Sequence, residues 1–591
     1  KYINEMTSLE YQCLCKEILT RPNPLQASPA IAQKVLVSIK ISPDAKPGKY
    51  ELRLLCGNGI SNPLSFEVSN CREYTEDYFV SPRKEKKILK IDEFPAVING
   101  EIMPGERDSV FFQARKGEKI CFSLKGRALI PFLGDAVPGW FQPFISIYDS
   151  KKYLISYADD HYHAPDPILN FCPHRDGEYE IEIRDSIYRG REDFVYRLYA
   201  EKISADNQLE TELRPPSSFS HLTLLNLGDE RTNPNRQIQF PCLISNTFLD
   251  GQTTHLYSAN FAEGEKIIFE SYARRGGSPT DTIIQIFDSD NKIIAANDDY
   301  KNINFSFLAQ HADSYCAVNI KSSGKYQIRI SETQRKSGKD YKYLLRIDHP
   351  RQDFAAFLYP SAINCPPGAF APVNVKIERF DEFNADIKIK IKDAPNGTFL
   401  AGETIPQNSS QNTFTIFVPP TLKNGVYQIK LSATAEINGT SIERELIPCD
   451  ELMQAFIYTH LFPSKESLLC VGGRKISLPN LEMPEKLIFS PGETKEVSIK
   501  SKDFHKVDRQ LEFEFHSAPD GLKIIESKLY PDSCSIKIQC AENAKAAHQN
   551  IIFQVRNNDK KNNRKSPPVI LPPILTQIQP NLPVPLNPQL K

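Results

Sequence analysis

The 591-residue sequence lacks the features that define several large functional classes. Lys and Arg number 72, Asp and Glu number 73, and both signs are scattered, so no basic field is present to hold nucleic acid. No apolar run approaches the roughly 18 residues that cross a bilayer, so we expect no membrane span. The chain begins at Lys1, without a charged segment followed by an apolar one, and we therefore expect any export signal to lie outside it.

Motifs that carry catalysis are missing as well. The sequence contains no GxSxG, HExxH, phosphate-binding loop or kinase signature, and no S-x-x-K pattern with its partner motifs. The short Gly57-Asn58-Gly59 run is a hairpin turn without the strand, helix and acidic residue of a dinucleotide site. We therefore predict that the protein is not an enzyme.

The 13 cysteines include no CxxC pair, which argues against a zinc ribbon or a thioredoxin-type redox site. Two interpretations stay open, because connectivity does not follow from sequence: buried free thiols, or bridges within sandwich domains. The candidate bridges are Cys121–Cys172, Cys242–Cys316 and Cys365–Cys449.

What the sequence does contain is a long internal repeat. Residues 94–199 carry FP, GEKI, IYDS, ADD and GEYEIEI, and residues 240–347 carry FP, GEKI, IFDS, NDD and GKYQIRI in the same order. The offset between the copies is 147 at Gly117, 139 at Asp149 and 147 again at Gly177, so compensating loop insertions surround a shared framework. A repeat of this length is a complete domain and not a solenoid unit of about 20–50 residues.

Strict alternation of apolar and polar side chains predicts β-strands in both copies, and helical periodicity is absent over any useful length. In the first copy we expect Tyr179, Ile181 and Ile183 in the core, and Glu180, Glu182 and Arg184 in water. In the second copy we expect Tyr326, Ile328 and Ile330 inside, and Gln327 and Arg329 outside. Alternation of this kind is typical of antiparallel sheets with one wet face, so both copies are predicted to be jelly-roll β-sandwiches.

The whole chain is predicted to be all-β, a row of tandem β-sandwiches with turn signals about every 8–12 residues. After residue 557 the prolines accumulate, and fixed φ angles with missing donors predict an extended, disordered tail. The predicted parts are a partial immunoglobulin-like domain at 1–70, a linker at 71–90, the first repeat copy at 91–203, a linker at 204–232, the second copy at 233–349, an immunoglobulin-like sandwich at 350–460, a linker at 461–481, a second immunoglobulin-like sandwich at 482–556 and the tail at 557–591.

Longer strings carry a family resemblance. They are 134–142 (GDAVPGWFQ), 157–160 (YADD) and 185–197 (DSIYRGREDFVYR) in the first copy, and 276–279 (GGSP), 297–299 (NDD) and 311–315 (HADSY) in the second. The repeated unit resembles the bacterial pre-peptidase C-terminal domain, a secreted β-sandwich found beside proteases and in large surface proteins. The resemblance covers most of residues 35–556 and implies an exported protein with two such domains flanked by immunoglobulin-like ones. It also implies a non-catalytic role in secretion, anchoring or substrate contact.

Aspartates in the loops of both copies suggest calcium, because Ca²⁺ takes six to eight oxygen ligands from carboxylates and carbonyls. The alternative is that they cap turns by accepting backbone N–H bonds. The candidate ligands are Asp281, Asp288, Asp298, Asp299 and Asp313 in the second copy and, with weaker grounds, Asp135, Asp149, Asp159 and Asp160 in the first.

Two surface features were considered for binding. Trp140, Phe141 and Phe144 could form a platform for a sugar or peptide, although aromatic side chains in a sandwich more often lie in the core. The arginines between 184 and 197, with Asp185, Glu192 and Asp193, are expected to form ion pairs that brace a loop.

The resulting hypothesis is an exported scaffold or adhesion protein of the bacterial cell surface or matrix, which binds protein or polysaccharide and could self-associate. The alternatives are an accessory region of a larger secreted hydrolase, for substrate binding or secretion, and a surface-layer subunit.

Overall fold

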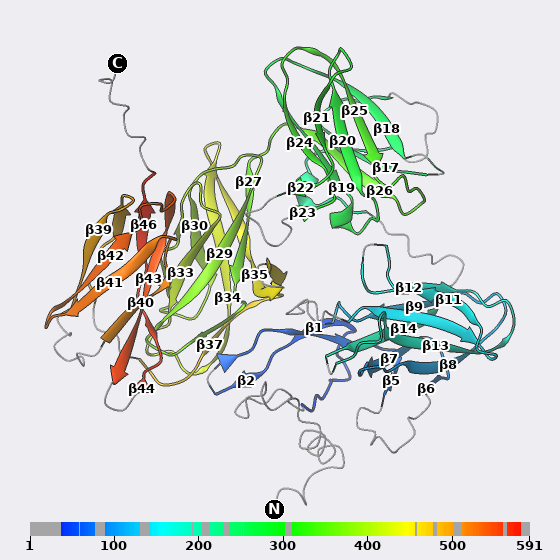
Figure 1. Cartoon of the computed structure of the whole chain (residues 1–591), viewed down its shortest axis with the longest axis horizontal. Coiled ribbons are helices and arrows are strands. Elements are labelled where there is room, and N and C mark those ends of the chain that lie inside the picture. Colours follow the sequence, from blue (N-terminus) through cyan, green and yellow to red (C-terminus); the bar gives the residue numbers. More distant parts are fainter. Residues whose placement is uncertain are drawn as a thin grey trace, which may run out of the picture. The chain divides into compact units, whose positions relative to one another are not determined.

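The computed structural model describes residues 37–57, 59–76, 89–129, 141–162, 164–191, 193–203, 213–227, 236–249, 251, 253–301, 310–454, 458–476, 481–501, 511–559 and 564–580. These residues form strands and two 3₁₀ turns, η2 (Ser217–Phe219) and η3 (Arg274–Gly276), which confirms the all-β prediction (Figure 1). They include no helix long and apolar enough to cross a membrane. The chain divides into two compact units, one built mainly from 64–210 and the other from 211–453 and 457–591.

The first repeat copy is a sandwich of two five-stranded sheets. One sheet has the order β11 (Leu154–Ala158), β10 (Pro143–Asp149), β13 (Gly177–Asp185), β8 (Asp108–Ala114), β6 (Leu89–Ile91). The other has the order β12 (Ile168–Phe171), β9 (Ile120–Lys125), β14 (Val195–Lys202), β7 (Ala96–Glu101), β5 (Arg72–Thr75).

The second copy repeats this topology strand for strand. Its sheets have the orders β21 (Ile293–Asn297), β20 (Thr282–Phe287), β25 (Gly324–Glu332), β18 (Thr254–Phe261), β16 (Arg236–Gln237) and β24 (Tyr315–Asn319), β19 (Lys266–Tyr272), β26 (Lys342–Asp348), β17 (Cys242–Thr247), β15 (Thr223–Asn226). A small sheet of β22 (Tyr300–Lys301) and β23 (Gln310–His311) is added. The sequence repeat is therefore a repeat of one ten-stranded domain.

The edge strands correct two predicted linkers. β5 lies in the segment 71–90, β6 begins in it and ends at Ile91, and β15 lies in 204–232, yet each adds a parallel edge strand to its sandwich. These strands are only three or four residues long, and charged residues follow them, so composition alone assigned them to linkers.

The cores follow the predicted alternation, with one correction. Tyr326, Ile328 and Ile330 are buried as expected, and so are Tyr179, Ile181 and Ile183 in the first copy. However, Glu180 and Glu182 are buried as well, not in water. β13 is the middle strand of its sheet. Lys152, from the turn after β10, forms an ion pair with Glu180, and Arg107, before β8, and Arg184, on β13 itself, form ion pairs with Glu182, so long basic side chains close over both carboxylates.

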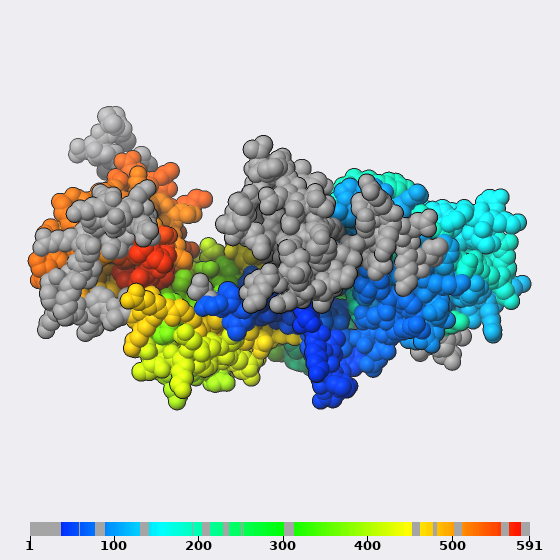
Figure 2. Space-filling view, turned by 90° about the horizontal axis from the view of Figure 1, so that it is seen from below, coloured from blue at the N-terminus to red at the C-terminus, as the bar shows by residue number. Residues whose placement is uncertain are grey.

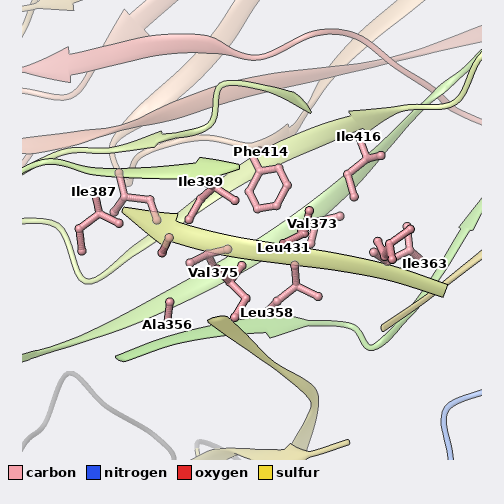
Figure 3. Close-up of a cluster of buried hydrophobic side chains, with 14 of the residues drawn as sticks. Ala356, Leu358, Ile363, Val373, Val375, Ile387, Ile389, Phe414, Ile416 and Leu431 are labelled. Atoms are coloured by element: carbon pink, nitrogen blue, oxygen red, sulfur yellow. The ribbon is translucent and has the colours of Figure 1, made fainter. Parts of the chain in front are cut away.

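The third domain is an eleven-stranded sheet wrapped around a main hydrophobic core, with a smaller cluster of Phe357, Tyr359, Cys449 and Leu461 beside it. Its strands are β27 (Asp353–Tyr359), β28 (Ala362–Cys365), β29 (Phe370–Phe380), β30 (Ile387–Asp393), β31 (Phe399–Ala401), β32 (Thr404–Ile405), β33 (Gln411–Phe417), β34 (Gly425–Ile437), β35 (Thr440–Gln454), β36 (Tyr458–Pro463) and β37 (Ser467–Val471). Figure 3 shows side chains such as Val373, Ile389 and Phe414 pointing into this core. The predicted linker at 461–481 is wrong for β37, which pairs with β28 and β34 and buries Leu469.

The fourth domain is a sandwich that includes part of the predicted tail. Its strands are β38 (Lys486–Phe489), β39 (Thr494–Lys500), β40 (Leu511–Ser517), β41 (Leu522–Leu529), β42 (Ser533–Cys540), β43 (Ala547–Asp559), β44 (Arg564–Lys565), β45 (Val569–Ile570) and β46 (Ile574–Ile578). β46 lies between β38 and β43 and buries Ile574 and Ile578. In Figure 2 the red C-terminal segment is set into the orange surface of this domain. The tail prediction fails here because the prolines flank a proline-free alternating stretch instead of interrupting it.

The N-terminal segment does not form the predicted sandwich in its described part. β1 (Gly48–Leu52) pairs with β4 (Leu64–Val68), and β2 (Leu55–Cys56) pairs with β3 (Gly59–Ile60). Apolar and polar residues alternate in 37–41, yet these residues belong to no sheet, and Val37, Ile39 and Ile41 are exposed. Alternation predicts a strand only where a partner strand supplies the hydrogen bonds.

The described cysteines are free thiols. Cys242 and Cys316 lie in one row of a sheet with Ile347 and Phe269 between them, which separates their Cα atoms by about 14 Å, twice the limit for a disulfide. The thiols of the other two candidate pairs, Cys121–Cys172 and Cys365–Cys449, are also unbridged.

Because β46 completes the fourth sandwich, we expect Ile574→Ala to destabilise that domain by about 2–4 kcal/mol through lost packing and a cavity. Hydrogen-exchange protection of residues 533–553 in the full chain measures the change. Ile525→Ala, at a 47% exposed position of β41, is the matched control and should change protection little. Equal protection in both variants would show that 574–578 are not part of the core.

Candidate functional site

Asp149 and Asp288, two of the predicted calcium ligands, occupy the same hairpin turn in the two copies. Asp149 accepts hydrogen bonds from the backbone amides two and four residues later, at 2.8 and 3.0 Å. Asp288 accepts the same pair of bonds, at 3.0 and 2.9 Å. The amide bonds hold the pKa of Asp149 below its usual value. Both residues therefore cap a turn, which is the alternative role considered for them.

Asp313 holds a loop closed in the second copy. Its fully buried carboxylate accepts hydrogen bonds from three consecutive backbone amides, residues 273–275, at 3.0, 2.7 and 3.2 Å. The Nε of Arg275 adds a further bond at 2.8 Å. Asp166 does the same in the first copy with the amides of residues 126–128. Since both oxygens of Asp313 are already bonded, this residue is a structural anchor.

Asp281, Asp298 and Asp299 remain as the calcium candidates of the second copy. Burial raises the pKa of Asp281, a hydrogen bond from Thr333 and the charge of Arg274, 3.9 Å from the Oδ2 of Asp281, oppose the increase, and the charges of Asp299 and Asp298 add to it. The three carboxylates therefore lie in one electrostatic neighbourhood, which also contains Arg274. The Oδ1 of Asp281 is buried and accepts no hydrogen bond within the described part of the chain. In the first copy Asp159 and Asp160 are exposed, and Asp135 lies outside the described residues.

An acidic group in the first copy was missed by the sequence analysis. Carboxylate oxygens of Glu76, Glu106 and Asp108 lie within 4.8 Å of one another. Asp108 is buried and accepts a hydrogen bond from the Tyr196 hydroxyl at 3.0 Å. The sequence gives no sign that these three residues lie together. Glu76 follows β5, and it reaches this edge of the sandwich only because β5 pairs in parallel with β7.

The second copy has a histidine at the position of Asp108. By register this residue is His255, whose Nδ1 lies 2.7 Å from the hydroxyl of Tyr343, the counterpart of Tyr196. Burial lowers the pKa of His255 to about 4, so the imidazole is neutral at pH 7. The two copies thus share the same strands and register but place different polar side chains, Asp108 and His255, at the equivalent position.

The outer face of the first copy carries a stack of three rings and one guanidinium. Phe144 of β10 stacks on Tyr157 of β11, with ring centroids 5.5 Å apart and planes at 8°. The guanidinium of Arg184 on β13 lies 4.0 Å from the Phe144 centroid and 4.6 Å from that of Tyr188. We call Phe144, Tyr157, Arg184 and Tyr188 the aromatic stack.

The aromatic stack is both fixed and accessible. Arg184 donates hydrogen bonds to the carbonyls of Asp185 and Ser186, at 3.1 and 3.0 Å, which orients its guanidinium. Tyr157 and Tyr188 are 59% and 50% exposed. Three more exposed apolar side chains lie close to the stack in the sequence. Tyr153 and Leu154 come shortly before Tyr157, and Ile187 comes directly before Tyr188. A preorganised, half-exposed row of rings is the kind of surface that binds sugar rings, methylene chains or aromatic side chains at little entropic cost.

The second copy lacks this surface. The shared register places Ile283, Ala296, Ser331 and Arg335 at the positions of Phe144, Tyr157, Arg184 and Tyr188. Tyr188 and Arg335 both have positive φ, 60° and 57°, so even the turn is retained while its side chain differs. The aromatic stack is therefore not required by the fold.

Only part of this surface was predicted from the sequence. Of the predicted platform, Phe144 belongs to the stack, Phe141 is buried in the core against Phe194, and Trp140 lies outside the described residues. The predicted ion pairs are present between Arg189 and Asp185 and between Arg191 and Asp193. Tyr157 was missed because it meets Phe144 only through the pairing of β11 with β10. Tyr188 was missed because the side of the sheet on which a loop residue falls depends on the turn.

Among solved structures, the chain is similar to the pre-peptidase C-terminal domain of a collagenase from Bacillus anthracis. It is 16% identical, the match covers 20% of this chain and 100% of that chain, and the TM-score is 0.16. No family model and no curated protein matches the chain.

Because Asp313 is a buried anchor, we expect Asp313→Asn to destabilise the second copy by about 2–4 kcal/mol through lost charge-assisted hydrogen bonds. Hydrogen exchange of residues 266–287 in the full chain measures this loss. Asp290→Asn, an exposed substitution beside the hairpin turn, is the control and should change protection by less than about 0.5 kcal/mol. A calcium-dependent stability that disappears in Asp313→Asn would instead assign this residue to a metal site.

The calcium prediction now rests on Asp281, Asp298 and Asp299, and we test it by melting. An ion that binds only the folded second copy stabilises it by about 2.7 kcal/mol at one hundred times its dissociation constant. We expect millimolar calcium to raise the melting temperature of the full chain relative to chelator, and Asp298→Asn to reduce the increase. Identical melts with calcium and chelator would remove the prediction.

Proposed function

We propose that this chain is a non-catalytic binding protein of the bacterial cell envelope or extracellular matrix, in which the first repeat copy holds an extracellular protein or polysaccharide on its aromatic stack. The observation that carries the proposal is the exposed, fixed stack of Phe144, Tyr157, Arg184 and Tyr188. Its absence from the second copy, which has the same topology, supports a selected binding role for these side chains over a structural one. Export rests on the sequence resemblance alone.

The same surface would also serve an accessory region of a larger secreted hydrolase. A catalytic domain in the complete reading frame would favour that alternative. A surface-layer subunit, in turn, would form two-dimensional arrays or filaments as a pure protein.

A depletion assay tests the proposed function. The full chain is incubated with insoluble polymers, including cellulose, chitin, peptidoglycan and fibrous protein, and the fraction left in solution is measured. We expect binding to at least one polymer, and a loss of about tenfold or more in Tyr157→Ala and Tyr188→Ala, since each stacked ring is worth about 0.5–1.5 kcal/mol beyond its buried area.

Tyr530→Ala is the matched control, because Tyr530 is 47% exposed on the fourth domain and takes no part in the stack. Its binding should equal that of the unmodified chain. Equal binding by all four proteins, or binding to none of the polymers, would contradict the proposal.

A further inference from the structure

A second surface lies in the other unit, where the second copy faces the third domain. A cleft of about 660 Å³ is lined by residues of η2, β19, β24 and β26 and by β29 with the turn that follows it. Asp381 in that turn accepts hydrogen bonds from Arg346 at 2.7 Å and from the Tyr315 hydroxyl at 3.1 Å. The backbone amide of Arg351 also donates to Asp381, at 2.6 Å. A buried carboxylate therefore ties the two walls of the cleft together.

Most charges in this cleft are already paired. Glu270 accepts hydrogen bonds from Arg275 at 2.9 Å and from Arg346 at 3.1 Å. Arg444 forms an ion pair with Asp353 at 2.9 Å. Because their partners occupy these guanidinium groups, an anionic ligand would have to displace an existing ion pair.

Glu378 is the exception. Its carboxylate lines the cleft and forms no ion pair or hydrogen bond with the side chains that the structure describes. Burial raises the pKa of Glu378 to about 7; nearby Arg275 opposes the increase, and Glu270 adds to it. A partly desolvated carboxylate without a partner gains free energy when a cation or a hydrogen-bond donor reaches it.

Aromatic rings line the same cleft as this carboxylate. Tyr272, Tyr300 and Tyr315 line the cleft, and the rings of Tyr300 and Tyr315 meet edge to face at 5.6 Å. Ring faces attract a cation and cover the methylene chain that carries it. The cleft thus places one carboxylate without an ion-pair partner together with three tyrosine rings, in a lining that is otherwise largely polar and charged. This combination is complementary to a flexible chain that ends in a positive charge.

We propose that this cleft binds the protonated amine or guanidinium of a lysine or arginine side chain from a protein ligand, with Glu378 as the paired anion and the tyrosines as its walls. The site does not depend on the aromatic stack of the first copy. Its partner is a protein with an accessible basic side chain, whereas the stack fits an uncharged polymer surface equally well.

Ligand-observed NMR on the full chain tests the proposal with N-acetyl-arginine amide and N-acetyl-lysine amide. The neutral probe N-acetyl-norleucine amide has similar size. We expect dissociation constants on the order of a millimolar for the cationic probes and at least tenfold weaker binding of the neutral one. Equal binding of charged and neutral probes, or no cationic binding at about 20 mM, would overturn the proposal.

The variant E378Q keeps the shape of the side chain and removes its charge, so it should weaken binding of the cationic probes about tenfold. The matched control is E436Q, which removes an exposed carboxylate of the same domain outside the cleft and should bind as the unmodified chain does. Unchanged binding in E378Q would also overturn the proposal.

A pH series keeps the test decisive if E378Q does not fold. Because the pKa of Glu378 is raised, the group is protonated at pH 5.5 and ionised at pH 8, and cationic binding should strengthen several-fold between these values. A flat pH dependence in the unmodified chain would contradict the proposal. E378Q, where folded, separates the effect of Glu378 from the other charged groups of the cleft, which are His221, Glu270, Arg275, Arg346, Arg351, Asp353, Arg379, Asp381, Glu382 and Arg444.

Discussion

Face-to-face packing of two sheets is the constraint on which both repeat copies depend. Each ten-stranded sandwich places one side of every strand in a shared apolar core, and this burial supplies most of the driving force for folding. The described cysteines add no covalent bridges. The inner faces must therefore stay apolar, and the outer faces are free to change.

The conserved anchors of the two copies are polar groups that close loops over these cores. Asp166 and Asp313 each bind three consecutive backbone amides, and Asp149 and Asp288 cap the same hairpin. Buried N–H groups need acceptors, and a carboxylate can satisfy several at once, so these aspartates recur without a metal being required to explain them. The surfaces that we propose for binding lie elsewhere, on an outer face of the first copy and at a boundary between domains, where the copies differ.

Much of the architecture was predictable from local pattern. Alternation around Ile181 and Ile328 identified strands, and the offsets between the copies identified a repeated domain. The predictions that failed are those that depend on contacts with other segments of the chain. Short edge strands such as β5 looked like linker, residues 574–578 looked like tail because prolines flank them, and Glu180 and Glu182 were expected in water although adjacent strands cover them. The calcium candidates show the same limit, since some loop aspartates cap turns, as Asp288 does, and others form ion pairs, as Asp281 does with Arg274.

The sequence by itself determined the class of fold and the duplication, because side-chain periodicity and repeated turn motifs are local properties that survive without knowledge of partners. Only the tertiary structure decided which side chains meet. Tyr157 and Tyr188 join Phe144 and Arg184 through strand register and a turn of positive φ, and Glu378 is left without a partner because residues more than one hundred positions earlier pair with each other. Such proximity arises from the three-dimensional path of the chain, which no local pattern encodes.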